Sequence, residues 1–176
     1  NNIIVLHGQR RTGKTSVLYR LPEVLAASHY CVLLDMQGIA VRSESELFYT
    51  LSDEIAYALD KAAVPVTLPP RAEYDAQPEF TFRSRFLRGI YPALGEKHLL
   101  LMFDEFEELQ RHVEEGHIGP GIFPFLRTLM QHEQPVDFIF SGTHKLEDLA
   151  AEYWSILFNI ATYKQISFLE RQEVER

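Results

Sequence analysis

The stretch HGQRRTGKTSV, residues 7–17, decides how this chain is interpreted. It follows the apolar, β-branched run IIVL (3–6), which predicts a short buried strand. Two glycines, Gly8 and Gly13, lie five positions apart, and Lys14 comes directly after the second. The residues that follow have the composition of a helix, so we expect a glycine-rich turn between a strand and a helix.

The spacing Gly8-x-x-x-x-Gly13-Lys14-Thr15 matches the Walker A pattern. Backbone N–H groups must wrap closely around phosphate oxygens, which favours glycine, and the helix that follows directs its N-terminal dipole at the anion. Lys14 would place its charge on the β- and γ-phosphates of ATP, and the Thr15 hydroxyl would ligate Mg²⁺. The predicted nucleotide-binding residues are Gly8, Gln9, Arg10, Arg11, Thr12, Gly13, Lys14, Thr15 and Ser16.

Arg10 and Arg11 lie inside this loop, and their role is less specific than that of Lys14. They could brace the loop, face solvent or contact phosphate. We expect bracing rather than direct phosphate contact.

Composition narrows the class of protein. The chain has 176 residues, of which 46% are hydrophobic and 24% charged, as in one ordinary globular domain. The formal net charge of -8 argues against a broad nucleic-acid-binding face. The single cysteine, Cys31, cannot form an internal disulfide, and no apolar run approaches the roughly 18 residues of a membrane helix. We therefore expect a cytoplasmic protein that does not enter a membrane.

Strands and helices alternate along the chain. Strands are predicted at 2–6, 30–36, 98–109 (ending in acids), 136–142 and 162–169; helices at 13–27, 43–62, 80–94, 122–132 and 146–158; and loops at 64–79 and 114–121. The strands are almost continuous hydrophobic runs, which is typical of a parallel sheet covered on both faces. The pattern predicts an α/β fold of three layers.

Asp104 and Glu105 end the apolar run LLLMF and are the best candidates to complete the site. Ligands of an open parallel sheet bind at the carboxyl ends of its strands, where these acids would lie. Asp104 would hold Mg²⁺ through water, and Glu105 would orient and deprotonate the attacking water. The alternative is an acidic helix start, because Glu107 and Glu108 follow.

A second acid, Asp35, is followed by Gly38 and resembles the Asp-x-x-Gly metal motif of GTPases. It follows Lys14 by only 21 residues, and the chain has no Asn-Lys-x-Asp motif for guanine. We therefore expect Asp35 to lie near the site without being the metal ligand, and a GTPase remains the minority interpretation.

Ser141 and Thr143 end the fourth predicted strand, in FSGTHKL. Either hydroxyl could contact the γ-phosphate or the attacking water, and either could equally be a loop or helix cap. The sequence leaves these alternatives open. The histidines are not spaced in the sequence as metal ligands usually are, so no metal site is predicted from them.

The segments GQRRTGKTSVL, LLLMFDEFEEL and FIFSGTHKLEDL, in this order, resemble P-loop ATPases of the additional-strand, catalytic-glutamate division. Within it the chain is most similar to AAA-type archaeal ATPases and STAND signalling ATPases. The resemblance implies a mostly parallel five-stranded sheet of order 5-1-4-3-2, binding of ATP with Mg²⁺, and slow hydrolysis that switches conformation. It also implies that residues 1–176 are one core domain of a longer protein. A helical lid and a winged-helix module would follow the segment ISFLERQEVER (166–176).

Two departures from these families affect the expected activity. The upstream Gly-Arg-Glu element is missing, and the usual Leu-Tyr/Phe-Gly-Arg run would place its arginine at Ile160. Residues 146–163 contain no arginine at all, so catalysis in trans by an arginine finger is not expected. The sequence favours a STAND-like switch with weak turnover.

Three functions follow from these patterns. The first is an ATP-hydrolysing switch module with other domains of its chain and protein partners; the second is a nucleotide-gated scaffold with little hydrolysis. A nucleic-acid-loading ATPase is third and needs a basic strip. Arg83, Arg85 and Arg88 lie in one predicted helix, but positions i, i+2 and i+5 do not share a face of an α-helix.

Overall fold

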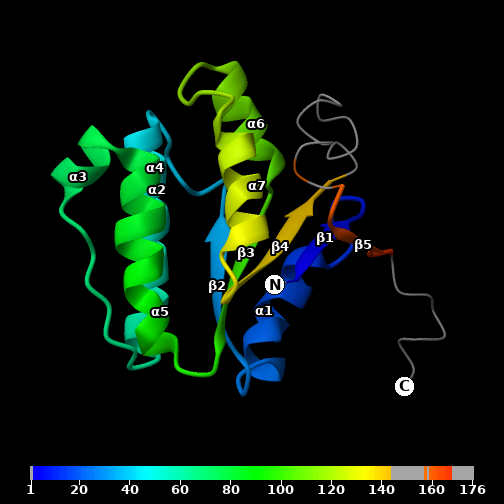
Figure 1. Ribbon diagram of the computed structural model, residues 1–176. Coiled ribbons are helices and arrows are strands. Elements are labelled where there is room, and N and C mark those ends of the chain that lie inside the picture. Colours follow the sequence, from blue (N-terminus) through cyan, green and yellow to red (C-terminus); the bar gives the residue numbers. More distant parts are fainter. Residues whose placement is uncertain (1, 144–156, 158, 168–176) are drawn as a thin grey trace.

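The computed structural model describes residues 2–143, 157 and 159–167. Its centre is a five-stranded sheet in which every pairing is parallel, with strand order β2-β3-β4-β1-β5 (Figure 1). This is the order 5-1-4-3-2 expected from the resemblance, so the predicted fold class is confirmed. The strands are β1 (Ile3–His7), β2 (His29–Asp35), β3 (His98–Asp104), β4 (Val136–Gly142) and β5 (Thr162–Gln165).

Helices lie between the strands. They are α1 (Lys14–Val24), α2 (Glu44–Lys61), α3 (Arg71–Ala76), α4 (Pro78–Phe80), the π-helix η1 (Thr81–Leu87), α5 (Arg88–Leu94), α6 (Glu107–Glu114) and α7 (Ile122–His132). Ser43 caps α2, since its side chain accepts a hydrogen bond from Glu46 N at 3.2 Å. Within the part of the chain that the structure describes, no helix combines the length and apolar character that crossing a membrane requires.

Alternate residues of each strand face opposite sides of the sheet, and each side has its own core. Leu100, Met102 and Ile139 pack with Leu18 of α1 on one face. The larger core on the other face contains Leu101 and many aromatic rings, and is covered by α2, η1, α5 and α7 (Figure 1). Both faces of the central strands are thus buried, which explains why the strands are continuous apolar runs.

The sequence prediction was wrong in the region before β3. The proline-rich stretch expected to be a loop over 64–79 contains the short helices α3 and the start of α4. Tyr74 of α3 is fully buried and its hydroxyl donates to Ser52 Oγ of α2 at 2.7 Å. This buried tyrosine holds the segment against α2, although the four prolines of residues 64–79 predicted a loop.

The helix predicted over 80–94 begins as a π-helix, and this changes which arginines share a face. Hydrogen bonds of a π-helix join residues i and i+5. Arg83 and Arg88, five positions apart, both bind Glu133 at the end of α7, at 2.7 and 3.0 Å. They are therefore structural ion-pair partners and do not form a free basic strip.

Candidate functional site

The loop of residues 8–13 leaves β1 and delivers the chain to the start of α1. Gly13 caps the helix with φ 91°, and Arg11 also has positive φ, 65°, so the loop turns through left-handed backbone. Gly8 lies against the segment after β5: a Cβ added there would approach Ile166 O to 2.3 Å. The two glycines thus serve different needs, close approach at Gly8 and conformation at Gly13.

Lys14 is the first residue of α1 and is only 6% exposed. Its ammonium donates to the carbonyl oxygens of Gly8 and Gln9, at 3.0 and 2.9 Å. The charge is therefore held over the loop by neutral acceptors, and an anion in the loop could compete for it.

Thr15 brings the loop into contact with the end of β3. Its hydroxyl donates to Asp104 Oδ2 at 2.7 Å, while Asp104 Oδ1 accepts from Glu105 N at 3.1 Å. Asp104 is only 5% exposed. The two residues predicted to share a metal, 89 positions apart in sequence, thus meet at one edge of the sheet.

Glu105 follows in a left-handed conformation, φ 50°, which is uncommon for a residue with a side chain. Burial raises the pKa of its carboxyl, as do the charges of Glu107 and Asp104 and a hydrogen bond with Glu107, while Lys14 acts in the opposite direction. The strained backbone turns the chain from β3 toward α6 and directs this carboxyl into a cavity.

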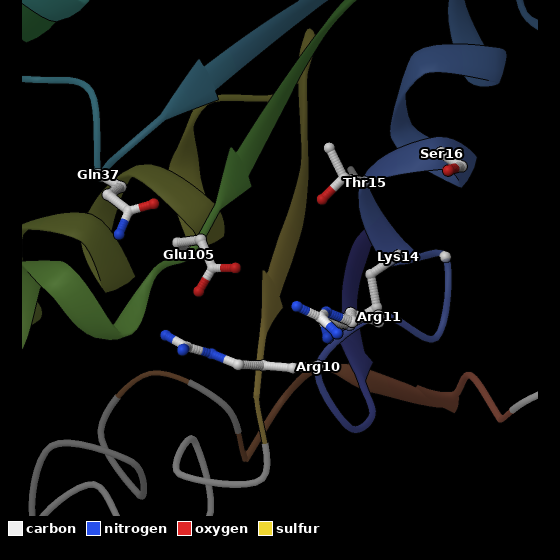
Figure 2. Close-up of a pocket in the computed structure, with 8 residues that line it drawn as sticks. Arg10, Arg11, Lys14, Thr15, Ser16, Gln37 and Glu105 are labelled. Atoms are coloured by element: carbon white, nitrogen blue, oxygen red, sulfur yellow. The ribbon is translucent and has the colours of Figure 1, made fainter.

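That cavity has a volume of about 770 Å³ and lies at the carboxyl ends of the strands (Figure 2). Figure 2 shows Arg10 and Arg11 extending from the loop, with Gln37 and Glu105 on the far side. The lining residues are Arg10, Arg11, Gly13, Lys14, Thr15, Ser16, Gln37 and Glu105. Three cations and one acid therefore face a single polar space.

Gln37 is the lining residue that sequence reasoning missed. It follows β2, where Asp35 turns the chain by accepting from Gln37 N at 3.0 Å and from Gly38 N at 3.4 Å. Asp35 pairs with Asp104 in the sheet register, so it lies beside the site, as expected. A polar residue just beyond the end of β2, the strand beside β3, was the available signal.

Ser141 and Thr143 have different environments. Ser141 is fully buried and its hydroxyl has no hydrogen-bond partner among the described residues. Thr143 donates from its hydroxyl and its backbone N–H to Glu107 Oε1, at 2.8 and 3.1 Å. Neither residue lines the cavity of Figure 2. Thr143 thus binds Glu107, the acid that also raises the pKa of Glu105.

The comparisons with known proteins agree with this geometry. A family model described as AAA domain matches residues 1–150. No curated protein sequence matches the chain.

Among solved structures, a Walker-type ATPase of Pyrococcus abyssi has a TM-score of 0.63 at 17% identity, covering 98% of this chain and 51% of its own. Cdc6p of Pyrobaculum aerophilum has a TM-score of 0.54 at 18% identity, and the match covers 97% of this chain and 40% of Cdc6p. The Aeropyrum pernix ORC2 protein, solved in ADPNP–ADP complexes, has a TM-score of 0.58 at 12% identity. This match covers 98% of this chain and 44% of the ORC2 protein.

At these identities the likeness concerns the fold, and the chain spans between two fifths and about half of those proteins. The family match covers most of the chain and includes the loop, Asp104 and Glu105. The chain therefore belongs to the AAA domain family and has the core fold of an AAA-type P-loop NTPase.

Proposed function

We propose that this chain binds ATP with Mg²⁺ and hydrolyses it slowly, as the conformational switch of a larger regulatory protein of the STAND type. The observation that carries the proposal is the 2.7 Å contact between Thr15 and Asp104 beside a cavity lined by Arg10, Arg11 and Lys14. The contact joins the two oxygen ligands expected of a P-loop magnesium site.

The residues fit both groups. A hydroxyl and a carboxylate are hard oxygen ligands of the kind that Mg²⁺ prefers, and three facing cations complement a triphosphate. Bound Mg²⁺ would neutralise charge on the phosphates. Lys14 would exchange its carbonyl acceptors for phosphate oxygens. Glu105 would accept a proton from water, and burial and neighbouring acids make that carboxyl more basic.

The arginines support a role different from the bracing that the sequence favoured. Both residues line the cavity, and neither side chain has a hydrogen bond or ion pair within the described part of the chain. We propose that Arg10 and Arg11 contact phosphate oxygens directly, which would supply positive charge without an arginine from a second subunit.

The experiment compares Lys14→Ala and Glu105→Gln with the unaltered protein. Isothermal titration should show that Lys14→Ala abolishes ATP binding, whereas Glu105→Gln keeps it. In a phosphate-release assay Glu105→Gln should lose turnover by about 100-fold or more, the range for loss of a general base.

ATP binding without measurable phosphate release by the unaltered protein would favour the nucleotide-gated scaffold. Absence of ATP binding would refute both. The Aeropyrum pernix ORC1 protein was solved in complex with DNA. Here, however, Arg83 and Arg88 are occupied by Glu133, which leaves DNA loading the least supported function.

A further inference from the structure

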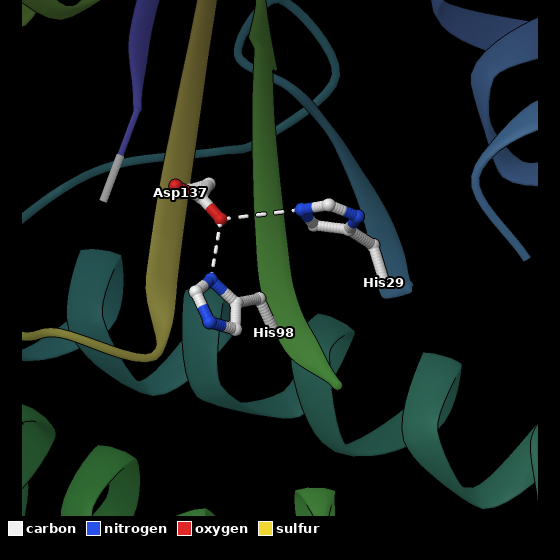
Figure 3. Close-up of side chains that lie close together, drawn as sticks. All are labelled: His29, His98 and Asp137. Atoms are coloured by element: carbon white, nitrogen blue, oxygen red, sulfur yellow. Dashed lines mark hydrogen bonds and ion pairs between the residues drawn. The ribbon is translucent and has the colours of Figure 1, made fainter. Parts of the chain in front are cut away.

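Three side chains with metal-binding atoms meet at the edge of the sheet opposite the nucleotide cavity (Figure 3). His29 begins β2, His98 begins β3, and Asp137 is the second residue of β4. Both imidazoles approach the same oxygen, Asp137 Oδ2: His29 Nε2 at 3.2 Å and His98 Nδ1 at 2.7 Å. The side chain of Asp137 is 3% exposed, that of His29 19% and that of His98 44%.

The surroundings of His29 hold its ring with Nε2 facing Asp137 and Nδ1 facing Ser28. The Ser28 hydroxyl donates to Leu25 O at 3.4 Å, and its oxygen lies 2.7 Å from His29 Nδ1. If that hydroxyl proton is committed to Leu25, Nδ1 must carry the hydrogen and donate it to Ser28. A neutral His29 then presents an unprotonated Nε2 to a carboxylate oxygen 3.2 Å away. In this tautomer the two facing lone pairs can hold a metal ion between them, whereas in the other tautomer the Ser28 hydroxyl donates to Nδ1 and Nε2–H donates to Asp137 Oδ2.

Outer contacts also hold the carboxylate. Asp137 Oδ1 accepts hydrogen bonds from the backbone N–H and the side-chain amide of Asn2, which leaves Oδ2 for the two imidazoles. Outer hydrogen bonds to a ligating histidine and a ligating carboxylate are typical of protein metal sites. The three residues stand on paired strands, so the backbone fixes their spacing.

We propose that His29 Nε2, His98 Nδ1 and Asp137 Oδ2 bind a divalent transition-metal ion, with Zn²⁺ the best fit to two imidazoles and a carboxylate. Ligand atoms of a tetrahedral zinc site lie about 3.4 Å apart, given metal–ligand distances near 2.1 Å. The 3.2 Å separation already meets this, and the 2.7 Å separation must widen by about 0.7 Å. His98 can make that adjustment because its ring is half-exposed. Water would complete the coordination on the exposed side.

A second cluster, formed by His112, Glu115 and His117, has ligand atoms at similar distances but a poorer setting. Nε2 of His112 is buried without a hydrogen-bond partner among the described residues, so its ring lacks the outer acceptor that a ligating histidine uses. It provides a matched control, since His117 is about as exposed as His98.

The test uses protein without a histidine tag, treated with EDTA and then dialysed. Titration with Co²⁺ should produce the intense visible absorption of a tetrahedral complex, which one equivalent of Zn²⁺ then displaces. His98→Gln should weaken Zn²⁺ binding at least about tenfold, and Asp137→Asn should do the same if it folds. His117→Gln should leave the affinity unchanged.

Binding that survives His98→Gln and disappears in His117→Gln would assign the metal to the other cluster and overturn the proposal. Absence of Co²⁺ absorption and of Zn²⁺ binding would overturn it as well, and would leave a proton between His29 and Asp137. Neither readout depends on ATP, so the result is independent of the proposed ATPase.

Discussion

Two hydroxyl residues near the end of β4 illustrate how neighbouring positions can have different roles. Ser141 is buried without a hydrogen-bond partner among the described residues, whereas Thr143 donates twice to Glu107. An unpartnered buried hydroxyl makes no stabilising hydrogen bond, and its desolvation is not compensated. Thr143 has a sufficient structural role already.

We therefore expect different results from removing each hydroxyl. Ser141→Ala should not lower the free energy of unfolding and should leave phosphate release unchanged, because its hydroxyl has no partner among the described residues and lies outside the cavity lining. Thr143→Val should lower the free energy of unfolding by about 1 kcal/mol, because its hydroxyl's bond to Glu107 is lost. Urea unfolding and phosphate-release assays measure the two effects. Reduced phosphate release in Ser141→Ala would show that this hydroxyl acts in catalysis.

Gly8 makes a second residue-scale prediction. Its position leaves no space for a Cβ, which would lie 2.3 Å from the main-chain oxygen of Ile166. Gly8→Ala should therefore destabilise the protein by about 1–3 kcal/mol, the usual cost of overpacking. Gly89, in α5, is the control: an added Cβ there meets nothing within 4 Å. Gly89→Ala should stabilise the protein by up to about 1 kcal/mol. Equal effects of the two changes would contradict the packing argument.

At the scale of elements, Glu133 joins α7 to η1 and α5. Its carboxylate accepts from Arg83, Arg88 and Tyr91, at 2.7, 3.0 and 2.7 Å. Burial alone would raise the pKa of Glu133, but these hydrogen bonds together hold it below its usual value. The aromatic-rich core lies beneath this junction, so the ion pairs fix how the helices cover the sheet.

A carboxyl group whose pKa is lower in the folded state than in the unfolded state stabilises the protein at pH values above its unfolded-state pKa. That stabilisation is lost as the pH falls through its folded-state pKa. Glu133→Gln should therefore lower the free energy of unfolding by about 1–3 kcal/mol near pH 7. The difference from the unaltered protein should shrink as pH falls below about 4, which urea unfolding at several pH values measures. A constant difference would refute the linkage. Arg85→Ala is the control, since Arg85 lies over the Phe80 ring and does not bind Glu133.

Element positions followed well from the sequence where a single periodicity dominated. The range of β4 was predicted without error, and α2 and α7 to within one residue, because apolar runs and serine caps mark them. The stretch 64–94 was predicted less well, and the strand predicted over 98–109 ends at Asp104 because α6 begins at Glu107. A π-helix has no distinct signature in residue type. The prolines of residues 64–79 indicated a loop, although the segment contains short helices held in place by the buried Tyr74. The expected helix over 146–158 falls outside the described residues, apart from Leu157.

The site followed from the sequence only where a motif fixes a backbone shape. Thr15, which follows the loop of residues 8–13, contacts Asp104 as expected, because the loop and the end of β3 lie at the same edge of a parallel sheet. The inward direction of Arg10 and Arg11 and the cavity position of Gln37 could not be predicted, since they depend on side-chain packing across the site. The cluster of His29, His98 and Asp137 depends on strand register, which a sequence does not display.

At the scale of the whole molecule, the charges available to the nucleotide site come from one chain. Arg10, Arg11 and Lys14 belong to the same loop and face the same cavity, while residues 146–163 contain no arginine to reach a neighbour. A ring-type ATPase completes each site with a neighbouring subunit's arginine. We propose that the site of this chain works without one.

We therefore expect the specific ATPase activity to stay constant as protein concentration rises from nanomolar to tens of micromolar, and to remain below about 1 s⁻¹. Arg10→Ala and Arg11→Ala should each weaken ATP binding, because a cation facing the polyphosphate is lost. Arg20→Ala is the control, since Arg20 is exposed on α1 and pairs only with Glu23 among the described residues. Turnover that rises steeply with concentration would show that a second subunit completes the site, and the switch would then act through assembly.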